Sequence, residues 1–178
     1  KQTPKQLADL SETINGKFIT EIANAAKQNH IQVIGSFYEK SRKKNRVYDT
    51  AFIINEYGKV ISTYRKVHLY DALGFRESDK MVSGSKITKP VSTSIGKIGM
   101  MICYDLRFPE LFRHYSKEGV ELMVCPASFT FPTGEAHWEA LCRARAIENQ
   151  CFFLAPNQTG IGAGKIASFG TSLIVDPW

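Results

Sequence analysis

The sequence of 178 residues lacks the features that assign proteins to several large classes. No apolar run approaches the roughly 20 residues that a helix needs to cross a bilayer. The first residues, KQTPKQ, are followed by no apolar signal core. Internal repeats and low-complexity linkers are also absent, and the length fits one domain with a single substantial core. We therefore expect a cytoplasmic protein without membrane contacts.

Cysteine is scarce, with 4 residues and no CxxC pair. This disfavours a zinc site or a thioredoxin-type redox pair, and disulfides are not expected without a secretory signal. We expect neither a metal nor a cofactor. Cys125 and Cys151 lie in apolar runs and Cys142 in a helical pattern, so these three are expected to pack in the core. Cys103 is left as the candidate reactive thiol.

Acidic residues are too few to balance the basic ones, and the formal net charge is +6. Such a charge can indicate an anionic partner such as nucleic acid. The only dense basic run, residues 42–46 (RKKNR), lies between two apolar segments and is interpreted as a solvated turn. Recognition-helix, RNP and zinc-finger patterns are absent, so we expect no nucleic-acid partner.

The hydrophobic periodicity predicts both helices and strands. Helices are expected at residues 5–29, 109–118 and 134–149, the last capped by Thr133. Strands are expected at residues 31–38, 47–54, 59–64, 91–95, 98–102, 122–126, 151–155 and 169–175. A long irregular loop covers residues 65–90. Hairpins in the first half and alternating helices and strands in the second predict α/β layers with a mixed sheet.

The most informative stretch is residues 99–110 (GMMICYDLRFPE). An apolar strand ends at Cys103, and a polar turn then leads into a helix. At such an elbow, N–H groups near the helix start can lower the pKa of a thiol and bind a developing oxyanion. On this geometry alone, a buried and inert cysteine remains the alternative.

A second polar cluster follows the strand at residues 59–64 and contains Lys66 and His68. A lysine there is commonly a solvated surface charge. A lysine that faces a thiolate would instead stabilise both the thiolate and a tetrahedral oxyanion. His68 and His137 leave open a Cys–His pair, and the lysine interpretation requires the Cys103 sulfur to lie nearer Lys66 than either histidine.

Residues 64–71 (YRKVHLYD) and 99–110 resemble the lysine and cysteine motifs of the nitrilase (carbon–nitrogen hydrolase) superfamily. Lys66 and Cys103 are 37 residues apart, a separation typical of that family. Residues 126–129 (PASF) resemble the loop after its next core strand, and residues 133–149 resemble its long helix. Because the motifs occur in the family's order and cover nearly the whole chain, the resemblance is specific.

The resemblance implies a four-layer α/β/β/α sandwich of the nitrilase type, formed by residues 1–178 as a single domain. It also implies hydrolysis of a small amide through a thioester on Cys103, with release of ammonia. Lys66 and the N–H group of Tyr104 are the implied oxyanion donors. Glu77 resembles a second family glutamate that positions the lysine and the substrate, and a solvated loop carboxylate is its alternative interpretation.

The family's general base is a glutamate in a Pro-Glu motif, and no residue before Leu7 matches it. Glu39 ends a different strand and is not assigned this role. We therefore expect a fragment, incomplete at both ends, that lacks the first strand with the base and the C-terminal segment. An inactive scaffold or assembly subunit of the same fold is the alternative. The family also implies a homodimer or a larger homo-oligomer.

The form YDLRFPE resembles the branch of omega-amidases and deaminated-glutathione amidases, whose substrates carry carboxylates. Arg107 is therefore a candidate to bind a substrate carboxylate bidentately, unless it forms a salt bridge to Glu110 or Glu148. Ser128 and Phe129 complete the implied substrate-binding set, together with Tyr104. An acyltransferase that uses the same thioester and a papain-like Cys–His enzyme remain open.

Residues 160–165 (GIGAGK) invite a comparison with a phosphate-binding loop. The pattern fails, because Thr159 occupies the place of the first glycine and Ile166, rather than Ser or Thr, follows Lys165. We interpret the segment as a surface loop, and a nucleotide-binding module is not expected.

Overall fold

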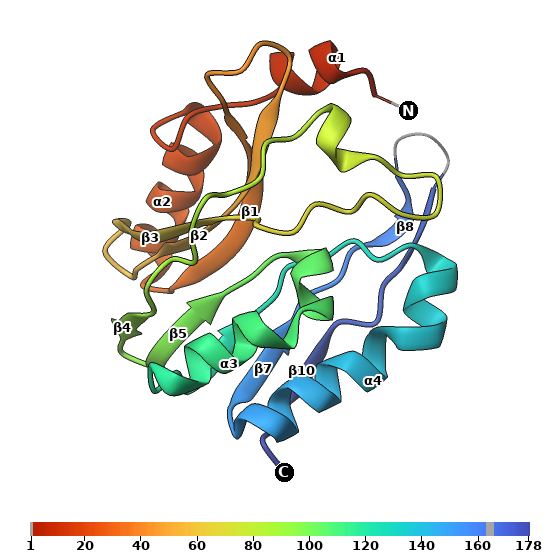
Figure 1. Ribbon diagram of the computed structural model, residues 1–178. Helices are drawn as coiled ribbons and strands as arrows, with labels where there is room; N and C mark the ends of the chain where they lie inside the picture. The colour runs from red at the N-terminus through yellow and green to blue at the C-terminus, as the bar shows by residue number, and fades with distance from the viewer. Residues whose placement is uncertain (1, 163–165) are drawn as a thin grey trace. The chain divides into compact units, whose positions relative to one another are not determined.

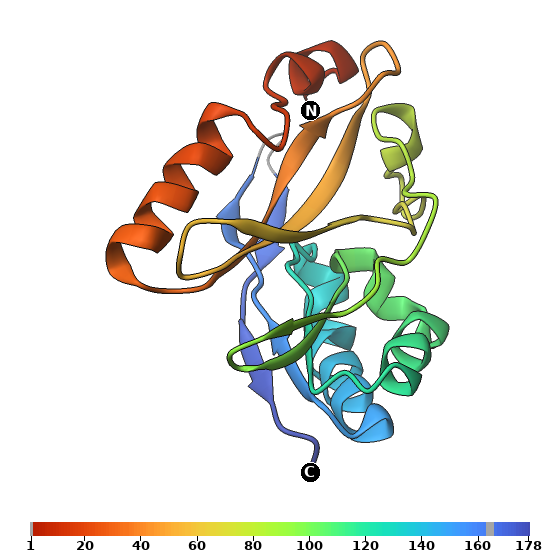
Figure 2. The ribbon, with the colours of Figure 1, turned by 90° about the vertical axis from the view of Figure 1, so that its left-hand side faces the viewer.

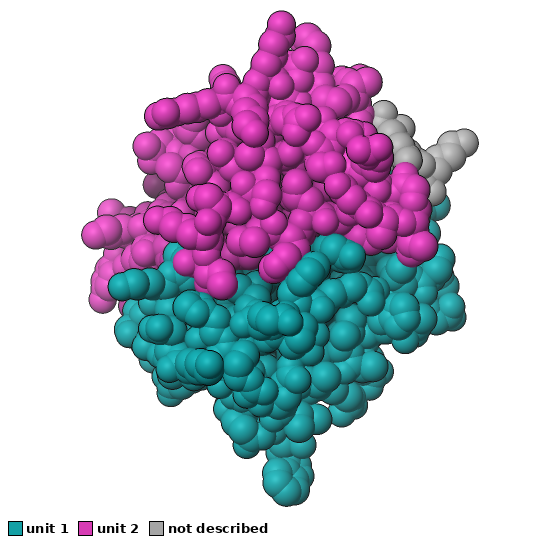
Figure 3. All heavy atoms as spheres, in the orientation of Figure 1, with its two compact units in different colours: residues 1, 88–178 teal, residues 2–87 magenta. Residues whose placement is uncertain are grey.

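The computed structural model describes residues 2–162 and 166–178. They form two compact units, residues 2–87 and residues 88–178, shown in different colours in Figure 3. Each unit has its own sheet and its own helices. Residues 163–165, which include part of the glycine-rich segment discussed above, lie outside the described residues.

The unit of residues 2–87 contains a three-stranded antiparallel sheet with two helices before it in the chain. Its helices are α1 (Pro4–Asp9) and α2 (Lys17–Asn29), and its strands are β1 (Val33–Lys40), β2 (Val47–Ile54) and β3 (Val60–Arg65) (Figure 1). The sheet order is β1-β2-β3. Ile19 and Ala26 of α2 pack with Phe52 and Ile54 of β2, so this helix covers one face of the sheet (Figure 2).

The helix expected at residues 5–29 is two helices, because the intervening segment pairs with the sheet. Glu12 bridges to Glu39, its N–H donates to Tyr38 O at 3.2 Å, and its carbonyl accepts from Lys40 N at 2.8 Å. These bonds satisfy backbone groups that a continuous helix would have used internally. Gly16 then caps α2 in an extended conformation.

The segment after β3 is irregular as expected, with one 3-10 turn, η1 (Glu77–Asp79). Backbone bonds anchor it to the sheet: Val82 N donates to Val47 O at 2.8 Å, and Gly84 N donates to Lys66 O at 2.8 Å. A long segment held in this way can present side chains in a fixed geometry.

The unit of residues 88–178 contains a five-stranded mixed sheet in the order β10-β7-β6-β5-β4. Its strands are β4 (Val91–Thr93), β5 (Gly96–Met100), β6 (Leu122–Val124), β7 (Phe152–Ala155) and β10 (Leu173–Val175). The three central strands run parallel and the two edge strands antiparallel. The helices α3 (Pro109–Lys117) and α4 (Phe131–Asn149) lie on the same side of this sheet (Figure 2). The predicted mixed sheet is thereby confirmed.

Three boundaries differ from the prediction. The N-cap of α4 is Thr130 rather than Thr133, and the two threonine hydroxyls lie 2.8 Å apart. The hairpin turn between β4 and β5 falls at residues 94–95 rather than at residues 96–97, which separate the two strands expected there. The strand expected at residues 169–175 is interrupted at Thr171, whose φ of 59° lies outside the β region. Its first part is β9 (Ala167–Phe169), which pairs with β8 (Thr159–Ile161).

Every helix within residues 2–162 and 166–178 is too short or too polar to span a membrane.

Candidate active site

Lys66 comes directly after β3 and is held by its backbone and by its side chain. Its N–H donates to Asp49 O at 2.9 Å, and its carbonyl accepts from Gly84 N at 2.8 Å. The residue is only 1% exposed. Its Nζ lies 2.7 Å from Glu77 Oε2. A buried ammonium is stable only when it is paired, so the carboxylate of Glu77 compensates this charge.

Glu77 is fixed by contacts to the backbone of its own loop. Its Oε2 also accepts from Tyr70 N at 2.7 Å, and its own N–H donates to Tyr70 O at 3.2 Å. The loop is closed further by Ser78 N, which donates to Asp71 Oδ1 at 3.1 Å, and the hydrogen bonds from Ser78 lower the pKa of Asp71. The side chain of Glu77 is 19% exposed. Glu77 is thus a paired and largely buried carboxylate, unlike the solvated loop carboxylate considered as an alternative.

Cys103 follows β5 and begins a 3-10 turn, η2 (Cys103–Arg107). Its φ is 48°, in the left-handed region that residues with a Cβ seldom adopt. Its N–H donates to Pro126 O at 2.9 Å. The helix α3 begins only at Pro109, so the residues directly after Cys103 form the 3-10 turn rather than the start of the helix.

Both ends of this turn are held by charged residues that the sequence analysis did not single out. Asp105 is fully buried, and its Oδ2 accepts from Ile102 N at 2.9 Å. Arg145 of α4 donates from Nε and Nη2 to Leu106 O at 3.0 and 2.9 Å. The signal available in the sequence was a charge at positions where the surrounding pattern is apolar.

The other three cysteines pack in the core, as predicted. Cys125, Cys142 and Cys151 are at most 2% exposed, whereas Cys103 is half-buried. Burial raises the pKa of Cys125 well above its usual range, that of Cys142 to about 12 and that of Cys151 to about 11. These three are therefore protonated, weakly nucleophilic thiols at neutral pH.

Arg107, at the end of η2, forms no ion pair within the described residues, so the predicted alternative of a salt bridge to Glu110 or Glu148 is wrong. Its Nη2 lies 3.1 Å from Nδ1 of His137, and its guanidinium lies over the ring of Phe129 at 5.8 Å. Glu148 pairs instead with Arg145, at 2.9 Å. His137, one of the two histidines considered for a Cys–His pair, is thus bonded to an arginine.

Ser128 and Phe129 lie in the loop before α4. Ser128 Oγ is 2.9 Å from Ser168 Oγ, and Phe129 is buried against Trp138, with ring centroids 4.7 Å apart. Phe129 N donates to Asn157 Oδ1 at 3.0 Å, a contact that the sequence analysis missed. Asn157 is polar and buried, so it is positioned to hold this loop.

Tyr104 is half-buried in η2, and its ring meets that of Phe108 edge-on at 5.5 Å.

Among the predicted site residues, the structure brings Arg107 and Phe129 together within the unit of residues 88–178. Within the unit of residues 2–87, it brings Lys66 and Glu77 together.

Glu39, which the sequence analysis did not assign as base, is engaged in its own sheet. Its carboxylate accepts from Arg65 at 2.6 and 2.7 Å and from Thr50 at 2.8 Å. Burial acts to raise the pKa of Glu39, but the hydrogen bonds from Arg65 and Thr50 outweigh it and the pKa is lowered. A carboxylate paired in this way is a poor proton acceptor.

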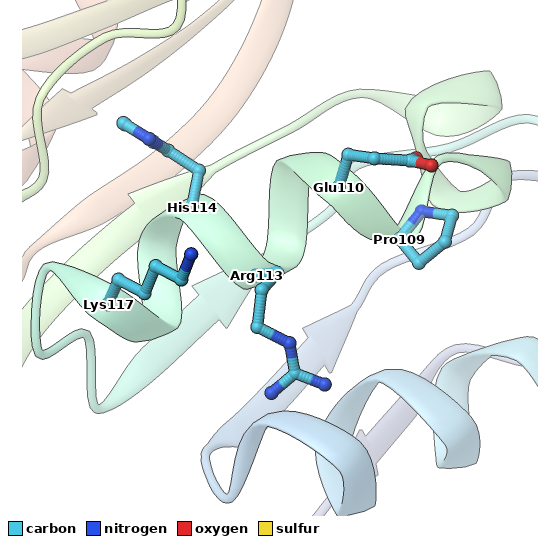
Figure 4. Close-up of a pocket in the computed structure, with 5 residues that line it drawn as sticks. All are labelled: Pro109, Glu110, Arg113, His114 and Lys117. Atoms are coloured by element: carbon cyan, nitrogen blue, oxygen red, sulfur yellow. The ribbon is translucent and has the colours of Figure 1, made fainter.

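Two further features lie apart from the predicted residues. A hollow of about 460 Å³ on α3 is lined by Pro109, Glu110, Arg113, His114 and Lys117 (Figure 4). In Figure 4, Arg113 and His114 point to different sides of the helix, so they do not converge on one ligand. Clusters of three or more metal-ligating side chains are not found in the part of the chain that the structure describes.

Comparisons with known proteins agree on one family. The family model described as carbon-nitrogen hydrolase matches residues 2–178. The deaminated glutathione amidase of Bos taurus is 40% identical over 184 residues, which cover 98% of this chain and 56% of that protein. The chain thus spans about half the length of the curated relatives that it matches.

Solved structures give the same result for the fold. The NitFhit protein of C. elegans superposes with a TM-score of 0.90 at 38% identity, covering 97% of this chain and 44% of that one. Saccharomyces cerevisiae Nit3, described as a member of branch 10 of the nitrilase superfamily, gives 0.86 at 35% identity, covering 98% of this chain and 64% of that one. The predicted nitrilase-type α/β fold is thereby confirmed.

Proposed function

Since the chain belongs to the carbon-nitrogen hydrolase family, we propose that the protein hydrolyses the C–N bond of small amides through a thioester on Cys103. The observation that carries the proposal is the setting of this thiol. It is the half-buried cysteine, held after β5 in a left-handed conformation, whereas the other three are buried. A non-glycine residue held in this strained region is a reason to look for function.

In the proposed reaction, the Cys103 sulfur attacks the amide carbon and the carbonyl oxygen gains negative charge. The ammonium of Lys66 and the N–H of Tyr104 donate hydrogen bonds to this oxyanion. The C–N bond then breaks, the nitrogen takes a proton and leaves as ammonia, and a thioester remains. Water attacks the thioester and releases the carboxylic acid, so that one difficult step is divided into two.

Glu77 is proposed to keep Lys66 charged and correctly aimed. The support is the 2.7 Å contact between the two side chains, together with the Tyr70 N–H that fixes the same oxygen. The proton transfers at sulfur and water need a base as well. The family assigns that role to a glutamate for which this chain has no match, so the tests use the full-length protein.

The substrate class is proposed to be amides that carry a carboxylate at the far end. Arg107 forms no ion pair among the described residues, and Phe129 and His137 hold its guanidinium in place. A planar guanidinium held in this way can accept a carboxylate bidentately. The name of the Bos taurus relative, deaminated glutathione amidase, supports a substrate of this class. Ser128, which precedes Phe129 in the chain and lies 2.9 Å from Ser168 Oγ, is proposed as a further polar contact to the substrate.

The test is ammonia release from glutaramate-type amides by the full-length protein. Arg107→Met should raise KM for dicarboxylic monoamides about 10–100-fold, the effect of losing a charge-assisted hydrogen-bonded pair. KM for an uncharged amide of the same length should stay unchanged. Equal KM values for wild type and variant on the dicarboxylic substrates would contradict the carboxylate role. An absence of turnover on all amides would favour the inactive scaffold, and product formation only with added amines would favour an acyltransferase.

We further propose a cytoplasmic location and assembly as a homodimer or larger homo-oligomer. The location is supported by the four free thiols, which persist in a reducing compartment. The assembly is supported only by the family resemblance. Cell fractionation and sedimentation of the full-length protein test the two points separately.

A further inference from the structure

Arg145 is a buried charge that the proposed reaction does not use. It lies in α4 and is 6% exposed. Its Nε and Nη2 both donate to Leu106 O, at 3.0 and 2.9 Å, and its Nη1 donates to Glu148 Oε1 at 2.9 Å. Its guanidinium also lies over the ring of Phe112, at 5.1 Å. Arginine is seldom this buried unless its donors are satisfied, so the contact to Leu106 is a specific one.

The contacted carbonyl belongs to the turn that carries the proposed nucleophile. Leu106 lies in η2, three residues after Cys103, and is fully buried. The last carbonyls of a short helix have no partner inside it. In this turn, Leu106 O receives two N–H groups from a helix that is distant in the sequence.

The turn needs such support because its own geometry is unfavourable. Cys103 has a φ of 48°, a backbone conformation that is unfavourable for a residue with a Cβ. The 3-10 hydrogen bonds that follow are also poorer than those of an α-helix. Asp105 holds the start of the turn through Ile102 N, and Arg145 holds its end through Leu106 O. The strained conformation persists when it is fixed from both sides.

We propose that Arg145 is a positioning residue for the nucleophile: by clamping Leu106 O it fixes the direction of the Cys103 thiol and of the Tyr104 N–H. The catalytic part of this inference rests on the proposed amide hydrolysis. The clamp depends on the planar shape of the guanidinium, because two of its N–H groups must reach one oxygen while a third reaches Glu148. A lysine ammonium keeps the charge but cannot reproduce this fork.

The test compares Arg145→Lys with Arg143→Lys in the full-length protein. Arg143 lies on the same helix, and its side chain is 62% exposed and pairs with Glu139. Arg145→Lys should lower kcat for a glutaramate-type amide about 10–100-fold, the effect of a small misplacement of the reacting group, with KM within about twofold. Arg143→Lys should leave both constants within about twofold of wild type.

A second readout separates positioning from loss of the core. Native protein is treated with iodoacetamide, and the labelled cysteines are identified by peptide mapping. In Arg145→Lys, labelling should remain confined to Cys103, at a rate at least about fivefold below that of Arg143→Lys. Labelling of the buried Cys142, on the same helix, would show that the core has loosened and would overturn the proposal. An unchanged kcat would overturn it as well.

The labelling rate does not depend on turnover, so the two proposals can fail separately. If wild type hydrolyses no amide, the proposed function fails, and equal Cys103 labelling in the two lysine variants would then overturn the clamp. Glu148→Gln is a milder variant that keeps Arg145 and removes the charge of its third partner. It should lower kcat about threefold, less than Arg145→Lys, because the two bonds to Leu106 remain. A larger loss in Glu148→Gln would contradict the clamp.

Discussion

Lys66 and Cys103 lie in different units, and the two are held by contrasting means. The ammonium of Lys66 is buried and pairs with the carboxylate of Glu77 at 2.7 Å. The thiol of Cys103 is fixed through the backbone, by its N–H bond to Pro126 O and by a turn held at both ends. The position of Lys66 therefore depends on charge compensation, whereas that of Cys103 depends on the backbone conformation of its turn.

This difference predicts how each side fails. Removing the carboxylate that pairs with a buried ammonium weakens the compensation of its charge, which costs several kcal/mol. Removing one of several hydrogen bonds to a turn leaves the others in place and costs less. The lysine side should therefore be sensitive to a single change, and the cysteine turn more tolerant of losing one support.

The largest effect is expected when the reacting atom itself is removed. Cys103→Ala should lower kcat by at least about 10⁴-fold, because no acyl-enzyme can form. Cys151→Ala is the matched control, since that thiol is buried and protonated, and it should keep kcat within about threefold. Steady-state ammonia release measures both. A Cys103→Ala variant with more than a tenth of the wild-type rate would contradict the assignment.

Glu77→Gln should be the next most damaging change. It keeps an acceptor for Tyr70 N but removes the charge opposite Lys66, so the free energy of unfolding should fall by about 3 kcal/mol and kcat about 100-fold. Urea denaturation and ammonia release give the two values. The control is Asp79→Asn in the same 3-10 turn, an exposed carboxylate 3.7 Å from Arg76, which should change stability by less than about 0.5 kcal/mol. Equal effects of the two changes would remove the basis of the comparison.

Asp105→Ala tests the tolerance predicted for the cysteine turn. It leaves Ile102 N buried without this acceptor, so the free energy of unfolding should fall by about 2 kcal/mol. Because Pro126 O and Arg145 still hold the turn, kcat should fall only about tenfold. The loss in kcat should thus be smaller than in Glu77→Gln. The reverse order would show that the turn, and not the ion pair, is the more sensitive side.

The smallest effect concerns the residue just before Lys66. Arg65 pairs with Glu39, whose pKa is lowered in the folded state, so this pair stabilises the protein above the ordinary carboxyl pKa near 4.5. The contribution, about 1 kcal/mol given that the Arg65 side chain is 46% exposed, is lost as the pH falls through the lowered value. Urea midpoints between about pH 3 and 6 should decline less in Glu39→Gln than in wild type. If the urea midpoints of wild type and Glu39→Gln declined in parallel over this pH range, a stabilising ion pair between Arg65 and Glu39 would be contradicted.

The apolar pattern of the sequence predicted the central strands, and the family resemblance implied the contact between Lys66 and Glu77. Strands β6 and β7 and the second half of β2, residues 51–54, are continuous apolar runs, which a hydrophobicity pattern detects. Lys66 and Glu77 are 11 residues apart, and the resemblance to the nitrilase family implied that this glutamate positions the lysine.

The supports of the cysteine turn were not predictable, because their partners are distant in the chain. Leu106 and Arg145 are 39 residues apart, and Phe129 and Asn157 are 28 apart. The break between α1 and α2 was missed for the same reason, since Glu12 leaves the helix to pair with the edge of β1. Hydrophobic periodicity shows which face of a single helix or strand is buried. It does not show which helices and strands pack against one another, and these contacts depend on that packing.

The most direct test of the account is to trap the thioester. The full-length protein is mixed with a glutaramate-type amide, quenched in acid during turnover, and analysed by intact mass and peptide mapping. A mass increase equal to the amide minus ammonia is expected on the peptide that contains Cys103. Turnover without any adduct, or an adduct on Cys125, Cys142 or Cys151, would contradict it.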